Sequence, residues 1–226
     1  MMLGLIPARS GSKGIPHKNT KPIAGHPLLW WTAQAARDSD LCDRLVLTTD
    51  SEDIAAVGRA CGLETPFLRP TDLAQDDTPM FNVVAHALCA LDDPSIDTVV
   101  LLQPTSPLRQ AWQLTDAYSC LTLEADSVVS VAPIPSTYSP DMACRLSQGR
   151  LYPYQGSWSN IATRQAAQPA YRRTGTVYII RRRTIEAGSL YGTNCRPYIE
   201  SAEASVSIDT SADWDRAERL LASRGS

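Results

Sequence analysis

The sequence lacks the features of several classes of protein. No apolar run among its 226 residues approaches the roughly 18 residues that a membrane-spanning helix requires, so we expect no membrane partner. The opening stretch MMLGLIPARS has neither the leading charges nor the apolar length of a signal peptide, which predicts a cytoplasmic protein. With a formal net charge of -3, the chain also lacks the extended basic face of a general nucleic-acid binder, so we expect no nucleic-acid partner.

Cysteine and histidine patterns of disulfide and metal sites are also missing. The six cysteines are scattered and form no C-x-x-C pair, which favours reduced thiols that fill small spaces in a core. The three histidines show no metal-ligand spacing. A length of 226 residues with 43% hydrophobic side chains suits a single folded domain over residues 1–226 with a sizeable core.

Short apolar runs alternate with helical patterns along the chain. The predicted strands cover residues 3–6, 44–50, 97–102, 126–133, 175–182 and 204–209. Five helices are predicted. The first has Pro27 as its first helical residue, and the second follows the capping residue Ser51. The others begin at Pro79, near residue 110 and at the capping box Thr210-x-x-Asp213. This order predicts an α/β fold with a doubly wound, mostly parallel sheet. Ligands of such sheets bind at the carboxyl ends of strands, so the loops after Ile6, Thr49 and Leu102 should converge.

The alternation of predicted strands and helices is interrupted between residues 134 and 172. Proline, serine, tyrosine and glycine dominate there, and the stretch ACRLSQGRLYPY predicts a β-hairpin that leaves the main sheet and returns to it. The aromatic residues of RLYPYQGSW have little local core to cover them, which is typical of an interface segment.

A basic loop follows the first predicted strand. Arg9, Lys13, Lys18 and Lys21 lie within thirteen residues, among glycines that let backbone amides turn toward a ligand. This combination favours a polyphosphate ligand. The alternative is a solvated, charged turn, which the serine, glycine and asparagine content of the loop disfavours. Neither the Walker sequence G-x-x-x-x-G-K-[ST] nor G-x-G-x-x-G is present.

Five motifs in the chain resemble, in the same order, those of the acylneuraminate cytidylyltransferase family. They are IPARSGSKGIPHKN, LRPTDLAQDDTP, LLQPTSPLR, YRRTGTVYI and SIDTSADWDRAE. The resemblance implies a Rossmann-like nucleotidyltransferase with a protruding β-hairpin dimerisation arm, formed by residues 134–172, and therefore a homodimer. It implies a CTP-dependent, Mg²⁺-assisted enzyme that transfers CMP to an acidic acceptor, a 2-keto-3-deoxy sugar acid, and releases pyrophosphate. Positioning and charge stabilisation provide most of the catalysis in phosphoryl transfer, which suits a loop of cations.

The same resemblance implies roles for individual residues. The expected catalytic residues are Arg9, Lys18 and Asp209, of which Asp209 is also the expected metal ligand. The expected nucleotide-binding residues are Pro7, Ala8, Arg9, Ser12, Lys13, Lys18, Asn19 and Arg69. The expected acceptor-binding residues are Gln103, Arg164, Tyr171 and Thr174. Asp50, Asp76 and Asp77 could also approach the site. A glutamine at the end of a strand can alternatively cap the sheet, and Asp209 can cap the last helix.

The chain departs from the family pattern at three places on the acceptor and metal side. Ser207 replaces the first aspartate of D-I-D, Thr174-Gly175 stands where sialic acid enzymes typically carry N-G, and the stretch STYSPDM contains no histidine or lysine. These changes predict an acceptor unlike N-acetylneuraminate: another keto sugar acid or, as an alternative, a small phosphonate. A CTP-binding module without catalytic activity and a nucleotidyltransferase specific for another base are the remaining alternatives.

Overall fold

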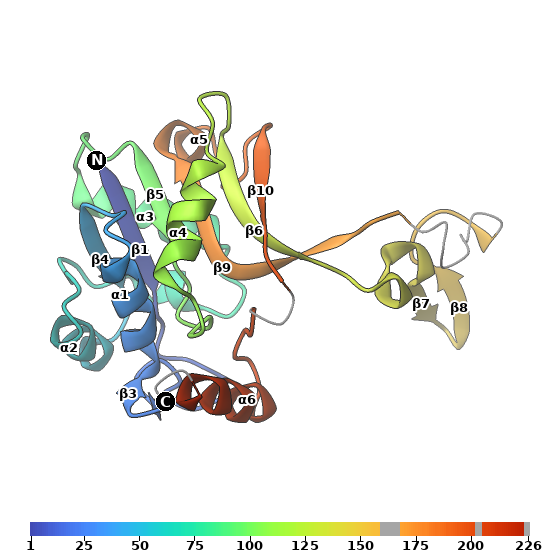
Figure 1. Cartoon of the computed structure of the whole chain (residues 1–226), viewed down its shortest axis with the longest axis horizontal. Coiled ribbons are helices and arrows are strands. Elements are labelled where there is room, and N and C mark those ends of the chain that lie inside the picture. The colour runs from blue at the N-terminus through green and yellow to red at the C-terminus, as the bar shows by residue number, and fades with distance from the viewer. Residues whose placement is uncertain (159–167, 202–204, 224–226) are drawn as a thin grey trace.

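The computed structural model describes residues 1–158, 168–201 and 205–223 of the chain. Within these residues, six strands form a central sheet in the order β10-β6-β9-β5-β1-β4 (Figure 1). Their bounds are β1 Met2–Pro7, β4 Arg44–Thr48, β5 Thr98–Leu101, β6 Ser127–Pro133, β9 Tyr171–Arg181 and β10 Cys195–Ile199. The pairs β1–β4, β1–β5 and β6–β10 are parallel, and β9 runs antiparallel to β5 and β6. The predicted mostly parallel α/β sheet is therefore confirmed.

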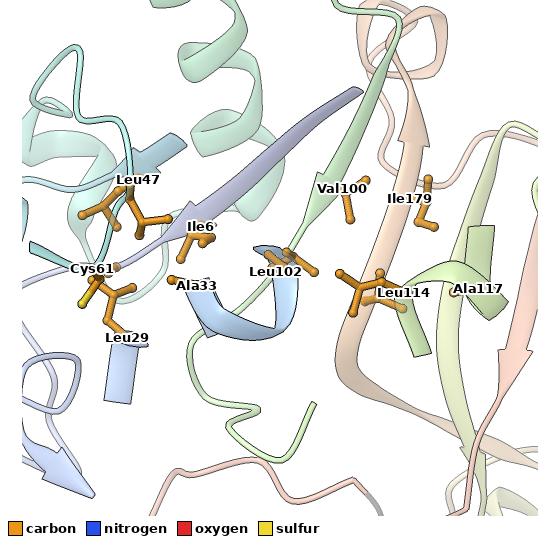
Figure 2. Packing of buried hydrophobic residues seen from close by; sticks show 14 of the residues in the cluster. Ile6, Leu29, Ala33, Leu47, Cys61, Val100, Leu102, Leu114, Ala117 and Ile179 are labelled. Atoms are coloured by element: carbon orange, nitrogen blue, oxygen red, sulfur yellow. The ribbon is translucent and has the colours of Figure 1, made fainter. Parts of the chain in front are cut away.

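Helices cover both faces of this sheet. The helices are α1 Leu28–Asp38, α2 Glu52–Ala60, α3 Met80–Leu91, α4 Ala111–Ser119, α5 Arg182–Glu186 and α6 Ser211–Ala222. Successive strand residues point to opposite faces: Leu5 packs in a cluster with α3, whereas Ile6 packs in a cluster with α1. Figure 2 shows the α1 and α4 side of the sheet, where Leu29, Ala33 and Leu114 meet the strand residues. None of the helices in the described residues is long and apolar enough to cross a bilayer.

The helix ends follow the cap residues of the sequence. The Ser51 hydroxyl accepts a hydrogen bond from the N–H of Ile54 at the start of α2. At the start of α6, Thr210 and Asp213 form the predicted capping box. Pro27 is the N-cap of α1, not its first helical residue as predicted, because it also pairs in a two-residue strand, β3 (His26–Pro27), with β2 (Pro22–Ile23).

The predicted excursion leaves the sheet after β6 and returns through β9. It carries two short 3₁₀ helices, η2 (Ser136–Tyr138) and η3 (Pro140–Met142), and the antiparallel strands β7 (Cys144–Ser147) and β8 (Arg150–Pro153). The paired ends of β6 and β9 form a stem that holds this hairpin away from the rest of the molecule (Figure 1). We call residues 134–170 the arm.

The prediction of a last strand at residues 204–209 is wrong. Residues 205–209 have no regular secondary structure, and a single backbone hydrogen bond from Ile208 N–H to Thr105 C=O ties them to the loop after β5. Val206 and Ile208 pack against Trp214 of α6, so the alternating pattern reflects this packing and not a sheet. The strand that completes the sheet is β10, which contains Pro197. Proline is tolerated there because β10 is an edge strand.

Candidate active site

A cleft lies where the carboxyl ends of β1 and β5 meet the segment that precedes α6. It has a volume of about 320 Å³ and is lined by residues of the loops after β1 and β5, by Arg69 and by Asp209. The loop after β4 lies beside it, because Asp50 accepts hydrogen bonds from the N–H and the hydroxyl of Ser10. The three loops therefore converge as the sequence predicts.

Arg9 and Lys13 share one carboxylate partner, Asp76. The Asp76 carboxylate lies in the loop before α3 and forms ion pairs with both cations. The hydrogen bonds from Lys13 and Arg9 hold the pKa of Asp76 below its usual value. Arg9 also donates to the carbonyl of Ala74 at 3.3 Å. Two cations that would hold phosphates are thus gathered around a single anionic group.

Lys18 joins the basic loop to the segment before α6. Its Nζ donates to the carbonyl of Ile208 at 2.7 Å and lies 3.6 Å from Asp209 Oδ1. Gly14 permits this close approach, because a Cβ at that position would lie 2.3 Å from the Asp209 carbonyl oxygen. The loop and the segment that carries Asp209 therefore form one wall of the cleft.

The other predicted nucleotide residues lie on the same loop. Pro7 and Ser12 line the cleft. Asn19 is buried, and its side chain donates to the Arg9 carbonyl at 3.0 Å, so it fixes the loop conformation. Ala8 is also buried, and its N–H is bound to the carbonyl of Thr48.

Arg69 is a buried cation at the edge of the cleft. Only 5% of its surface is exposed, and its Nε has no hydrogen-bond partner among the described residues. One Nη lies 4.0 Å from Asp50 Oδ1. Burial lowers the pKa of Arg69, and the Asp50 carboxylate offsets part of that effect. Arg69 also lines the cleft, so its guanidinium is a candidate cation for a polar ligand.

Asp209 is the residue that the family resemblance implies as a metal ligand. Its side chain is 71% exposed at the rim of the cleft, and the Ser207 hydroxyl lies 3.4 Å from its Oδ2. In the parts of the chain that the structure describes, no three His, Cys, Asp or Glu side chains gather closely enough to hold a metal ion by themselves. Mg²⁺ at nucleotide sites takes one or two carboxylates together with phosphate oxygens. This donor set fits a cation that arrives with a triphosphate.

The predicted acceptor residues do not all lie together. Gln103 lines the cleft. Thr174 is buried, and its hydroxyl donates to the Ser130 hydroxyl at 2.8 Å. Tyr171 lies half exposed at the junction of β9 and the arm, away from the cleft-lining residues, and Arg164 lies outside the described residues. Acceptor binding by Thr174, Tyr171 and Arg164 stays a prediction.

Two buried charges behind the cleft were not singled out by the sequence analysis. Arg109 is 3% exposed and donates hydrogen bonds to the carbonyls of Gln103 and Thr176 and to the hydroxyl of Thr32. Glu200 is 7% exposed. Burial lowers the pKa of Arg109, and the nearby Glu200 carboxylate raises it in part. The position of Arg109 within LLQPTSPLR was the one signal that could have drawn attention to it.

Sequence comparisons relate the chain to enzymes that use CTP. A family model described as cytidylyltransferase matches residues 3–223. The chain is 37% identical over 226 residues to the CMP-N,N'-diacetyllegionaminic acid synthase of Legionella pneumophila, covering 97% of this chain and 96% of that protein. It is 29% identical over 219 residues to the N-acylneuraminate cytidylyltransferase of Escherichia coli, covering 96% of this chain but only 51% of that protein.

Solved structures show the same fold at lower sequence identity. The structure of a CMP:2-keto-3-deoxy-manno-octonic acid synthetase complexed with CTP superimposes with a TM-score of 0.75 and 16% identity, covering 99% of both chains. A 4-diphosphocytidyl-2C-methyl-D-erythritol synthase from Anaerococcus prevotii gives a TM-score of 0.64 and 12% identity, covering 97% of both. The family match over nearly the whole sequence and the shared fold agree with the motifs and the cationic cleft, and the chain is therefore a member of the cytidylyltransferase family.

Proposed function

We propose that this protein transfers CMP from CTP to a 2-keto-3-deoxy sugar acid and releases pyrophosphate. The anomeric hydroxyl oxygen of the acceptor forms a bond to the α-phosphorus while the bond from that phosphorus to the bridging oxygen of the β-phosphate breaks. Pyrophosphate leaves, and the hydroxyl proton is lost to solvent. The observation that carries the proposal is one cleft lined by Arg9, Lys13, Lys18 and the buried Arg69, with Gln103 also in its wall.

The chain's own residues supply charge and orientation. Arg9, Lys13 and Lys18 neutralise the phosphate oxygens as negative charge spreads in the transition state, an effect that is strongest with preorganised groups. Arg69 lines the same cleft, and we expect its guanidinium to bind an oxygen of the nucleotide. Asp76 competes with the phosphates for Arg9 and Lys13, because its carboxylate forms ion pairs with both cations.

Mg²⁺ is the cofactor that we propose for this site, with Asp209 as its protein ligand. Bound beside the phosphates, it would offset their charge during the transfer. We expect Asp209→Asn to abolish the Mg²⁺-dependent activity, because asparagine keeps the size of the side chain and loses its charge. The measurement is the rate of pyrophosphate release as a function of Mg²⁺ concentration; an unchanged dependence would assign the metal to another ligand.

The Legionella relative and the departures from the family pattern support a sugar acid that differs from N-acetylneuraminate, whereas the Escherichia coli relative is named for N-acylneuraminate. The Legionella relative, matched along nearly its whole length, is named for N,N'-diacetyllegionaminic acid. A small phosphonate stays the alternative acceptor, and Arg172 and Arg173 at the start of β9 are the cations that would suit its charge.

An acceptor panel tests the proposal. Purified protein with CTP and Mg²⁺ is given N-acetylneuraminate, a legionaminic-type nine-carbon acid, an eight-carbon keto acid and a small phosphonate, and pyrophosphate is measured. We expect release with one of the sugar acids. Release with the phosphonate alone would correct the acceptor class, and CTP binding without release for any acceptor would indicate a non-catalytic CTP-binding module. Replacing CTP with the other nucleoside triphosphates tests the base.

We also propose that the protein acts as a homodimer joined through the arm. The arm exposes large apolar side chains that the described part of the chain leaves uncovered, including Leu146 at 73%, Tyr138 at 76% and Tyr154 at 64% exposure. Exposed apolar clusters of this kind mark contacts with another protein surface. A second copy would cover them, as the family resemblance implies.

A further inference from the structure

The strand β9 is kinked beside the cleft. The pairing of β6 with β9 is interrupted, and Ser130 of β6 stands opposite residues 174–177 of β9. The buried Ser130 hydroxyl holds both ends of this kink, since it accepts from the hydroxyl of Thr174 at 2.8 Å and from the N–H of Val177 at 3.0 Å. Bulges that re-aim a strand occur preferentially next to functional sites.

The kink brings backbone against the side chain of Gln103. Gly175, at its centre, has φ +79°, a conformation that side chains other than glycine rarely adopt. A Cβ at this position would lie 3.2 Å from Gln103 Oε1 and 3.6 Å from Ser106 Oγ. Gly175 therefore lies against the Gln103 amide, and Gln103 is also one of the residues that line the cleft.

Arg109 ties this kink to the main chain of Gln103. Its Nε donates to the Thr176 carbonyl at 2.5 Å, and one Nη donates to the Gln103 carbonyl at 2.8 Å. The other Nη donates to the hydroxyl of Thr32 in α1 at 2.8 Å. The rigid fork of a guanidinium fixes several acceptors at once, which an ammonium cannot do in the same geometry.

Glu200 holds the kink from the opposite side. Its carboxylate accepts from the hydroxyl of Thr176 at 2.6 Å and from the Nε2 of Gln113 at 2.9 Å. Thr176 is thus bound through its carbonyl to a buried cation and through its hydroxyl to a buried anion. This arrangement leaves the kink little freedom relative to the loop that carries Gln103.

We propose that Arg109 is a positioning residue for the acceptor: through the kink at Gly175 it fixes the Gln103 amide and sets the shape of the acceptor end of the cleft. The inference rests on the proposed function, since it takes Gln103 as an acceptor contact. An amide held at one place selects among acceptors by the position of their oxygens, and small displacements of such a group are costly. CTP, bound by the basic loop, should be insensitive to the kink.

A pair of glycine variants tests this inference. Gly175→Ala and Gly188→Ala introduce a methyl group at similar φ values, +79° and +84°, but Gly188 has no atom within 4 Å of the added Cβ. We expect Gly175→Ala to raise the KM for the acceptor about tenfold and to leave the KM for CTP unchanged. Gly188→Ala should change neither constant. An unchanged acceptor KM in Gly175→Ala, or an equal rise in both KM values, would overturn the inference.

Arg109→Lys tests the guanidinium itself. Lysine keeps the buried charge but loses the fork, so we expect a higher KM for the acceptor at an unchanged KM for CTP, with thermal unfolding measured alongside. If Arg109→Lys does not fold, the comparison of Gly175→Ala with Gly188→Ala tests the inference by itself. Wild-type protein that releases no pyrophosphate with any acceptor would refute the proposed function and, with it, this inference. If the wild-type protein is active but the variants do not change the KM for the acceptor relative to the KM for CTP, only this inference is refuted and the proposed function stands.

Discussion

At the scale of single residues, the cations of the loop after β1 differ in whether they line the cleft. Arg9 and Lys18 face the cleft, whereas the Nζ of Lys21 lies 4.3 Å from the ring centre of Trp214, outside the cleft lining. We expect Arg9→Ala and Lys18→Ala each to lower kcat by ~10²-fold, because each removes a preorganised charge from the transition state. Pyrophosphate release measures this.

Lys21→Ala is the matched control, since it removes the same charge from the same stretch. We expect its rate to stay within about twofold of wild type. A loss as large as that of Lys18→Ala would mean that the overall charge of the loop matters more than the individual contacts.

Asp76 competes with the substrate for Arg9 and Lys13. Replacing it with asparagine removes the carboxylate from both cations, so we expect Asp76→Asn to bind CTP about two- to fivefold more tightly, because more of the protein is then free to bind. Calorimetric titration with CTP, without acceptor, measures this. Asp77→Asn removes a charge one residue away and should leave the affinity as it is. Weaker binding by Asp76→Asn would show instead that Asp76 aligns the two cations.

The sequence predicts the location of some of these residues and not of others. The position of Arg9 and Lys18 in the cleft was predictable, because cations among glycines in a loop after a buried strand are unusual without an anion. Arg109 and Glu200 were not, since a charge in a sequence carries no sign of burial. Their burial depends on the loop after β5, α1 and β9 meeting behind the cleft, where Arg109 binds Thr32 and Thr176; these segments are far apart in the chain.

At the scale of elements, α6 supports the part of the cleft that carries Asp209. The Asp213 carboxylate accepts from the backbone N–H and the hydroxyl of Thr210, and from the N–H of Asp209 at 3.3 Å. We expect Thr210→Ala to lower the free energy of unfolding by about 1 kcal/mol, the usual cost of a lost N-cap. Chemical denaturation measures this, with the exposed Ser211→Ala as a control that should have little effect.

The stability conferred by this cap should depend on pH. The hydrogen bonds from Thr210 hold the pKa of Asp213 below its ordinary 3.8. A carboxyl group whose pKa is lowered by folding stabilises the protein above its ordinary pKa and loses that contribution as the pH falls through the lowered value. The difference between wild type and Thr210→Ala should therefore shrink below about pH 4. A constant difference down to pH 2 would exclude the ionised Asp213 from the cap.

Elements with strong local patterns were predictable, and those that depend on their neighbours were not. Local sequence alone predicts the apolar strand β5 and the helix caps at Ser51 and Thr210. The segment 205–209 has the alternation of a strand, but its side chains pack against Trp214 and the sheet position is taken by β10. Pro197 lies in β10, and a proline in a central strand would remove a hydrogen bond from the ladder. Only its place at the edge, where an N–H is not needed, makes it acceptable.

At the scale of the whole molecule, the arm carries apolar side chains that stay exposed in a single copy of the chain. Leu146 and Leu151 pair across β7 and β8, and both remain mostly exposed, at 73% and 59%. Two strands alone are marginally stable in water, so this hairpin needs a surface to pack on. Among the described residues the chain offers no such surface nearby, because the stem carries the hairpin away from the sheet and its helices (Figure 1).

We therefore expect the protein to behave as a dimer of twice the 24.6 kDa chain mass in size-exclusion chromatography with light scattering. Leu146→Thr combined with Leu151→Thr should shift the mass toward the monomer, because threonine keeps the strand propensity and removes apolar surface from the interface. Leu123→Thr is the matched control: Leu123 is 90% exposed and lies outside the arm, so its replacement should leave the mass unchanged. A wild-type monomer at micromolar concentration, or a dimer that survives the double substitution, would mean that the arm packs on something other than a second copy.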